Sequence, residues 1–420
     1  YDFMTDTRLK ELAEYGFDDV EISRLRNALF EIAKQTLEHY DEICEEDLRS
    51  LGQLTELRHE LRKHAPLAET NVMKLYSYID ELLDSIKDHG TPQFTRQARC
   101  AFMARSFCRT LVEKGYFTKQ EMDDFMLSIP TVASEFERDF DLYSHGKLSR
   151  DDFNHLYGHL RLGTYDIRSD SYRNIYFDVA SANLTGNNKV KQEAKSLDLE
   201  RLQVALDEAG IPVTPEKFIE FIKKATQNRE YFKFEFTKSL SLMLDVIVKL
   251  GEVMAIARED MSYLEIQDLL SYHSRDSYIQ TIETRRRFYH VNSYLVLPEV
   301  IFDVGDIDVI DIDEARPNFI TNKVVEAPIV NLDEDHDSDI TGKIVALTKA
   351  DPGYDWIFAK DIAGFVTKYG GAASHMAIRC AEFGIPAAIG CGEKIYQRIH
   401  RMQIMCLDCE NGRITEKQSQ

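Results

Sequence analysis

The sequence predicts a multidomain protein in which a mainly α-helical domain is followed by a small α/β domain. Two observations predict this fold class. The spacing of apolar residues changes from helical to strand-like near residue 317, and an acidic stretch separates the two patterns. A chain of 420 residues is long enough for two or three domains. We therefore expect a helical domain over residues 1–300, an acidic linker or hinge over 301–316, and an α/β domain over 317–420.

The helical domain is predicted from long amphipathic patterns. From residue 1 to about residue 143, apolar residues recur at helical spacing with acidic residues between them. The tripeptide Gly90-Thr91-Pro92 predicts a loop within this region, because glycine and proline both interrupt regular structure. Further helices are expected over residues 96–111, 119–129, 197–210, 216–226 and 228–254.

Past Pro317 the apolar residues alternate with a period of two, which predicts strands. Pro328 predicts that the first strand lies at an edge of the sheet, because proline has no N–H to donate. The expected strands span residues 323–330, 343–348, 364–368, 386–389 and 403–408. The expected helices between them span residues 354–360, 375–383 and 393–400.

Composition excludes several classes of partner. The net charge of −21 argues against nucleic acid and anionic membranes, because both require a basic surface. We see neither a run long enough to span a membrane nor a signal-peptide pattern. Seven scattered cysteines favour a reducing, cytoplasmic compartment over a disulfide framework, and we expect no metal site in the chain.

One stretch after a predicted strand combines a glycine turn with the start of a helix. Gly370 and Gly371 allow a tight reversal, Ser374 suits a helix N-cap, and Gly384 suits the residue after a helix. His375 would then lie in the first helical turn, where free N–H groups and the helix dipole favour an anion such as a phosphoryl group. The alternative for a lone histidine is a buried residue that caps a helix.

The run GGAASHMAIRCAEFGIPAAIG, residues 370–390, resembles the phosphohistidine motif of the PEP-utilising enzymes. The resemblance implies that residues 317–420 form a swivelling phosphohistidine domain. It also implies that His375 carries the phosphoryl group and that Ser374 and Gly371 help to bind it. Where the family has Ala-Arg-Glu, this chain has Cys-Ala-Glu, and Arg379 stands two places earlier than the family's arginine, on another face of the helix.

The order of the chain resembles the rifampin-phosphotransferase-like subgroup. Residues 376–420 are too few for the phosphoenolpyruvate barrel of other members, for which about 250 residues are typical. The acceptor is therefore expected upstream, in the helical domain. No Walker A motif occurs, and the chain opens at Tyr1 within a polar helical run. The resemblance implies that an ATP-binding domain precedes such a chain in the full-length polypeptide, and that this domain binds ATP and Mg²⁺.

Within this subgroup the chain is most similar to AMP-forming L-glutamine kinases of capsular phosphoramidate biosynthesis. The resemblance implies that His375 attacks the β-phosphoryl group of ATP and that AMP leaves. The pyrophosphorylated histidine then loses phosphate to water. The remaining phosphoryl group passes to the acceptor, here the amide nitrogen of L-glutamine. An amide nitrogen is a poor nucleophile, so the acceptor site should offer a general base and cations.

The segment of residues 151–173 is expected to contribute to that acceptor site. It resembles the acceptor-binding part of the subgroup, and its glycines predict that a helix ends and a polar loop begins. His159 and Asp166 are candidate bases, Arg161 is a candidate phosphoryl clamp, and Tyr165 is a candidate contact to the acceptor. His155 and His159 could also form a zinc pair, but no third ligand is evident nearby.

Arg229 and Lys233 are spaced i, i+4 on the expected long helix and could clamp a phosphoryl group. A solvated helix face, on which two glutamates balance the two cations, is the alternative. For the whole protein, one alternative keeps the mechanism but changes the acceptor to a group such as an antibiotic hydroxyl. The other alternative is a non-catalytic helical interaction module with a relic swivelling domain.

Overall fold

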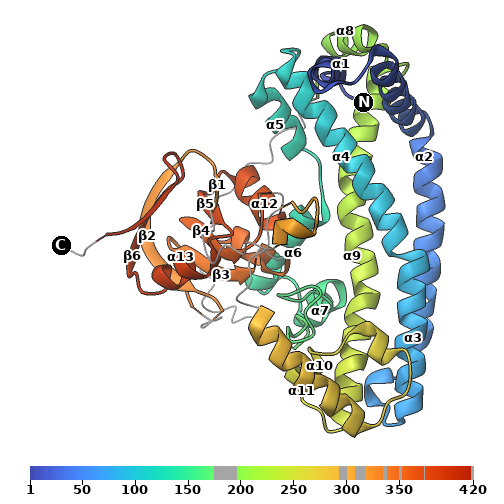
Figure 1. Ribbon diagram of the computed structural model, residues 1–420, viewed down its shortest axis with the longest axis vertical. Coiled ribbons are helices and arrows are strands. Elements are labelled where there is room, and N and C mark those ends of the chain that lie inside the picture. The colour runs from blue at the N-terminus through green and yellow to red at the C-terminus, as the bar shows by residue number, and fades with distance from the viewer. Residues whose placement is uncertain are drawn as a thin grey trace. The chain divides into compact units, whose positions relative to one another are not determined.

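The computed structural model describes residues 1–174, 196–292, 300–307, 317–333, 338–349, 352–372 and 374–417 (Figure 1). The chain divides into two compact units, each built from three separate segments. The first unit comprises Tyr1–Ala65, Glu81–Glu135 and Gly186–Leu240. The second comprises Pro66–Asp80, Phe136–Thr185 and Ser241–Gln420. Residues 308–316 of the expected linker lie outside the described residues.

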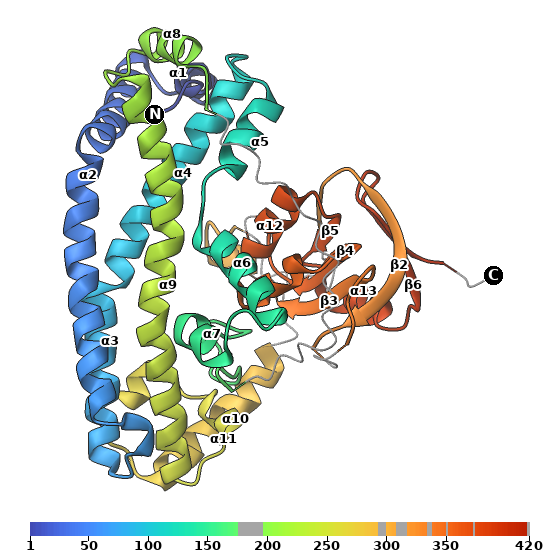
Figure 2. The same ribbon diagram turned by 180° about the vertical axis from the view of Figure 1, so that it is seen from behind.

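The first unit is entirely helical in its described residues. Its long helices α2, α4 and the first part of α9 run side by side in both views (Figures 1 and 2). The elements of this unit are α1 (Thr5–Glu11), η1 (Leu12–Tyr15), α2 (Asp19–Lys63), the end of α3 (Val72–His89), α4 (Thr91–Glu113), α5 (Lys119–Leu127), the start of α6 (Val132–Ser144), α8 (Leu199–Ala209) and α9 (Pro215–Val253), which continues into the second unit.

The core of the first unit is a cluster of aromatic and aliphatic side chains from these helices. Phe107 of α4 packs against Phe218 of α9 with ring centroids 5.1 Å apart, and Tyr40 of α2 meets Phe221 at 5.0 Å. Such aromatic pairs contribute beyond the area that they bury. The amphipathic patterns of the sequence therefore predicted the helices. The predicted packing face of α2 is only partly right, because Leu37 is buried whereas Leu25 and Ile32 are exposed.

The expected loop at Gly90-Thr91-Pro92 is wrong. Helix α4 begins at Thr91, with Gly90 as its N-cap residue and Pro92 in its first turn. Proline is tolerated there because the first N–H groups of a helix have no partner within the helix. The proline therefore marks the start of a helix rather than an interruption.

The second unit combines short helices with one sheet. Its helical elements are η2 (Pro66–Ala68), the start of α3 (Val72–His89), most of α6 (Val132–Ser144), α7 (Arg150–Tyr157), the end of α9, α10 (Arg258–Met261), η4 (Ile266–Leu269), α11 (Arg275–Asn292), η5 (Val304–Ile307), η6 (Pro352–Ala359), α12 (His375–Phe383) and α13 (Gly392–Ile399). The side chains of Tyr76 in α3 and Tyr278 in α11 share a buried hydrogen bond.

The sheet has seven strands in the order β1-β5-β4-β3-β2-β6-β7. The four central strands, in the order β5-β4-β3-β2, are parallel to one another. Strand β1 pairs antiparallel with β5, β6 with β2, and β7 with β6. The strands are β1 (Asn318–Ile320), β2 (Val324–Asn331), β3 (Ile344–Lys349), β4 (Gly364–Tyr369), β5 (Ala387–Ile389), β6 (Ile404–Asp408) and β7 (Arg413–Glu416). The first four residues of β3 and of β4 are all buried, as expected for parallel strands covered on both faces.

Five of these strands were predicted within one residue at each end, but the expected edge position of β2 is wrong. Strand β2 lies between β3 and β6. Its residues Val324–Pro328 pair with β6, and its residues Ile329–Asn331 pair with β3. Pro328 thus stands where the strand changes partners, and a missing N–H costs little at such a point.

The fold class, a helical region followed by an α/β sheet domain, is confirmed. The first strand begins at Asn318, close to the expected boundary at residue 317. The compact units do not follow that boundary, because the second unit also contains earlier helices. The domain limits 1–300, 301–316 and 317–420 therefore stay a prediction. Among the described helices, none is long and apolar enough to cross a membrane.

Candidate phosphohistidine and acceptor site

His375 is the first residue of α12, directly after the turn that follows β4. Gly370 has a φ of 134°, in the region that only glycine adopts readily, so the turn needs this residue. The Ser374 hydroxyl accepts a hydrogen bond from the N–H of Ala377 at 3.4 Å, and Gly384 ends the helix with a φ of 64°. The predicted N-cap and C-terminal glycine are confirmed. Gly371 is exposed beside this turn.

The ring of His375 faces a carboxylate that the sequence did not identify. Its Nε2 lies 2.7 Å from Oδ1 and 2.9 Å from Oδ2 of Asp355, a residue of η6. The His375 side chain keeps 22% of its surface exposed, so it is not sealed in an apolar interior. A proton on Nε2 would be donated to Asp355, which fixes the orientation of the ring. That nitrogen can receive a phosphoryl group only after Asp355 has moved away.

Arg379 lies one helical turn after His375 and interacts with the same carboxylate. Its Nε is 4.0 Å from Oδ1 of Asp355, and its terminal nitrogens form ion pairs with Glu137 of α6 and with Glu382. The guanidinium also lies over the ring of Phe383, with 4.6 Å between Cζ and the centroid. The face of α12 that carries Arg379 is therefore the face that carries His375. The cation is available near the phosphoryl position even though the family's arginine is absent.

The segment after α7 forms the predicted polar loop. Helix α7 ends at Tyr157, and the loop of residues 158–174 carries the candidate residues. His159 is buried, whereas Tyr165 is 59% exposed. The loop contacts η6, because the hydroxyl of Tyr172 donates a hydrogen bond to the carbonyl of Gly353. Both segments belong to the second unit, so the loop and the histidine segment lie in one compact body.

Arg161 is buried and fixes this loop to α9. Its Nε donates to the hydroxyl of Ser241 at 3.1 Å, its terminal nitrogens donate to the carbonyls of Ser169 and Ser241, and it pairs with Asp245. Burial lowers the pKa of the guanidinium, and the Asp245 carboxylate opposes that effect. The role of Arg161 as a phosphoryl clamp stays a prediction. In this arrangement the guanidinium is engaged in holding the loop.

A substitution tests whether Arg161 has a structural role. Because Arg161→Met leaves the Asp245 carboxylate without its buried partner, we expect it to lower the free energy of unfolding by about 3 kcal/mol. Arg229→Met is the matched control. Arg229 is half-buried and lies over the ring of Phe102 at 5.6 Å, a contact that contributes about 1 kcal/mol at most. Denaturant unfolding of both variants measures the difference, and equal stability would show that Arg161 is not structural.

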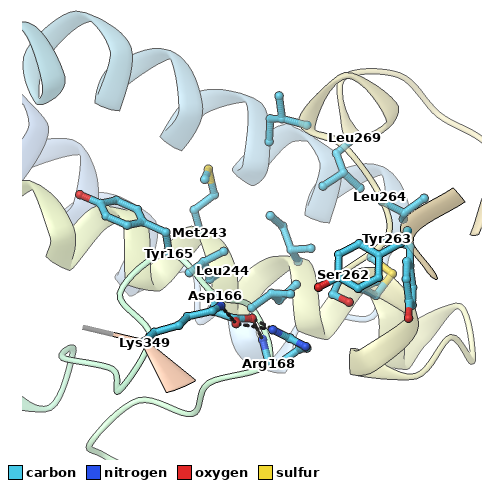
Figure 3. Close-up of a pocket in the computed structure, with 16 residues that line it drawn as sticks. Tyr165, Asp166, Arg168, Met243, Leu244, Ser262, Tyr263, Leu264, Leu269 and Lys349 are labelled. Carbon is cyan, nitrogen blue, oxygen red and sulfur yellow. Dashed lines mark hydrogen bonds and ion pairs between the residues drawn. The ribbon is translucent and has the colours of Figure 1, made fainter. Parts of the chain in front are cut away.

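A cavity of about 500 Å³ lies between the loop, the end of α9 and the segment around α10 and η4 (Figure 3). This volume falls within the usual range for small-molecule sites. Half of its sixteen lining residues are aliphatic or methionine, and three are tyrosines. The lining residues are Gly163, Tyr165, Asp166, Ile167, Arg168, Met243, Leu244, Ile247, Met261, Ser262, Tyr263, Leu264, Ile266, Leu269, Tyr289 and Lys349. We call it the acceptor pocket, after the acceptor site that the sequence predicts for residues 151–173.

The charged groups of the acceptor pocket centre on Asp166. Its carboxylate accepts hydrogen bonds from Arg168 at 2.7 and 3.0 Å and from the ammonium of Lys349 at 3.0 Å (Figure 3). Burial by itself would raise the pKa of Asp166, but these hydrogen bonds outweigh it and hold the pKa well below its usual range. A carboxylate of such low pKa is a weak base. Deprotonation of an acceptor by Asp166, which stays a prediction, requires that the acceptor displace one of the two cations.

The second predicted clamp lies in the other compact unit. Arg229 and Lys233 belong to the part of α9 assigned to the first unit, and both are half-buried. Their contact with a phosphoryl group stays a prediction. No cluster of three or more His, Cys, Asp or Glu side chains able to hold a metal ion occurs among the residues that the structure describes.

A comparison with known protein families supports the same chemistry at this site. Residues 340–412 match the family model described as the mobile domain of the PEP-utilising enzymes. The match runs from β3 to β6, and so includes Asp355, His375 and Arg379. It supports the family that the phosphohistidine motif indicated.

Similarity to one known protein supports the subgroup that the sequence indicated. Over 222 residues the chain is 27% identical to rifampicin phosphotransferase from Bacillus subtilis (strain 168). The aligned stretch covers 48% of this chain and 24% of the relative. The likeness supports the rifampin-phosphotransferase-like subgroup. Because it covers a quarter of the relative, the activity of the whole protein is a matter of proposal.

Proposed function

We propose that this chain is the phosphocarrier and acceptor-binding part of an ATP-dependent phosphotransferase that works through phosphohistidine at His375. The observation that carries the proposal is the position of the ring. His375 begins α12, keeps part of its surface open to solvent, and has Asp355 and Arg379 within reach. A helix N-terminus with a nearby guanidinium stabilises a phosphoryl group on the ring. The family match and the relative support the same chemistry.

The proposed reaction has two half-reactions. In the first, a ring nitrogen of His375 forms a bond to the β-phosphorus of ATP, and the broken P–O bond leaves its electron pair on AMP. Water then removes the terminal phosphate from the pyrophosphorylated ring. In the second, the acceptor atom bonds to phosphorus, the P–N electron pair returns to the ring, and the acceptor proton passes to a base. His159 and Asp166 are the candidate bases from this chain. ATP and Mg²⁺ are assigned to a preceding domain of the full-length, cytoplasmic polypeptide.

Two acceptors are proposed. L-Glutamine follows from the resemblance to the AMP-forming glutamine kinases. Arg168 could bind its carboxylate, because Lys349 also pairs with the Asp166 carboxylate and can keep that charge compensated. The second acceptor is a hydroxyl on a bulky apolar molecule such as rifampicin. The specific observation in its favour is the apolar wall of the acceptor pocket, of which an amino acid would fill only a part.

The experiment uses the full-length polypeptide and ATP labelled at the β-phosphate. We expect an acid-labile, base-stable label on the peptide that contains His375, formed together with AMP. Addition of L-glutamine or rifampicin should then discharge the label from the protein to the acceptor. Label on another residue, or none, would refute the phosphohistidine proposal. Label on His375 that neither acceptor discharges would refute only the acceptor assignment.

A further inference from the structure

Lys349 connects the acceptor pocket with the sheet that carries His375. It is the last residue of β3, and among the described lining residues it alone comes from the α/β segment. All the others belong to the loop after α7, to α9, or to the segment from α10 to α11. The pocket wall is therefore completed by a side chain of the phosphohistidine segment.

The ladder of the sheet places Lys349 beside the turn that leads to His375. Lys349 pairs with Tyr369, the last residue of β4, and Tyr369 is followed directly by Gly370. The parallel strands β3 and β4 therefore end side by side. Lys349 is the last residue of β3, and the turn that leads to His375 begins directly after β4. In α/β sheets, ligands bind at the carboxyl ends of the strands. The pocket and the histidine turn therefore both lie at the carboxyl ends of the parallel strands β3 and β4.

Two cations meet the same carboxylate at this point. Asp166 accepts three hydrogen bonds from Arg168, one of them from its backbone N–H, and Lys349 adds a fourth from a different segment of the chain. Arg168 and Lys349 thus share the carboxylate of Asp166, and Glu259 is a further acidic group that acts on Arg168. A phosphoryl group in transfer carries negative charge, and a fixed cation near it lowers the barrier.

We propose that Lys349 is a positioning residue for the second half-reaction: its ammonium, paired with Asp166, aligns the phosphohistidine segment on the acceptor pocket. The proposal rests on the proposed function. It assigns to Lys349 a role in transfer from phosphorylated His375 to the acceptor and none in the phosphorylation of His375 by ATP. A residue that only stabilised the fold would affect both half-reactions alike.

The exposure of the ion pair makes this separation measurable. The Lys349 side chain is 50% exposed, and pairs of this kind contribute about 1 kcal/mol or less to stability. Loss of the ammonium should therefore leave the protein folded. Misalignment of reacting groups by about 1 Å can slow a reaction by about 10²-fold. The expected effect on transfer is thus far larger than the effect on folding.

The test compares Lys349→Met, Lys349→Arg and Lys343→Met in the full-length polypeptide. Lys343 immediately precedes β3, at the opposite end of the same strand, and is the matched control. His375 is first labelled from β-labelled ATP, and the rate of labelling is recorded. Discharge is then followed with L-glutamine and with the antibiotic probe used above. We expect Lys349→Met to label normally and to discharge about 10²-fold more slowly, Lys349→Arg to recover most of the rate, and Lys343→Met to match the wild type.

A second readout needs neither label nor acceptor. Backbone hydrogen exchange of residues 163–168 should be faster in Lys349→Met than in the wild type and normal in Lys349→Arg. Equal discharge of Lys349→Met and wild type overturns the proposal. If His375 takes no label, or if neither probe discharges the wild type, the proposed function or its acceptor fails. The exchange experiment then decides on Lys349, and unchanged exchange in Lys349→Met overturns the proposal.

Discussion

Replacement of His375 by asparagine is expected to reduce turnover of the full-length polypeptide to the uncatalysed background, a loss on the order of 10⁶-fold. Asparagine keeps a polar side chain at the start of α12 but has no nucleophilic nitrogen that can carry a phosphoryl group. The variant should form no acid-labile label from β-labelled ATP. Release of AMP should also stop, because the first half-reaction requires the ring.

The matched control is His400→Asn. His400 is exposed, follows α13, and lies 3.3 Å from the side-chain amide of Asn331. It therefore belongs to the same α/β segment without facing Asp355. We expect this variant to keep the wild-type rate of labelling and transfer. Turnover by His375→Asn at more than a small fraction of the wild-type rate would contradict the phosphohistidine mechanism.

Replacement of Gly353 by alanine is expected to slow the second half-reaction by about 10²-fold while labelling of His375 stays within a factor of two. A Cβ at residue 353 would lie 1.7 Å from the carbonyl oxygen of Arg161 and 2.5 Å from the Cα of Leu162. Both atoms belong to the backbone, so the contact can be relieved only if η6 and the loop move apart. The hydrogen bond from Tyr172 to the Gly353 carbonyl would then be lost.

The change should lower stability, because it loses a buried hydrogen bond, but it should not prevent folding. Gly353 is not among the glycines with positive φ, so alanine can adopt its backbone conformation. Gly52→Ala is the control, because Gly52 lies inside α2 with open space around it. That change should raise stability by about 0.5–1 kcal/mol and leave transfer unchanged. Wild-type transfer by Gly353→Ala would show that this close contact is absent when the phosphoryl group moves.

Elements with a strong local pattern could be predicted from the sequence. Helix α12 was predicted with its bounds, because an N-cap serine, an amphipathic run and a terminal glycine act within ten residues of one another. Strands β3 and β4 were predicted because their apolar runs are bounded by polar residues. The short strands β1 and β7 were missed, since three or four residues do not show a period.

The partners of the site could not be predicted in the same way. Asp355 is 20 residues from His375, and Glu137 is 242 residues from Arg379. Such contacts depend on how η6 and α6 pack, and no periodic pattern encodes them. The one signal available was the spacing of Arg379, four residues after His375, which places both on one face of a helix. Tyr165 and Asp166 were named as candidates because Gly158 and Gly163 predict the end of a helix and a polar loop after it.

The change of partner within β2 has a consequence for the robustness of the site. Residues Val324–Pro328 are in register with β6, and residues Ile329–Asn331 are in register with β3. The two ladders overlap only at Ile329, whose N–H still donates to the carbonyl of Gln403, the residue before β6. Fraying of the C-terminal hairpin β6–β7 can therefore open the first ladder while the second stays closed. The strands that present His375 are in this way insulated from local unfolding at the end of the chain.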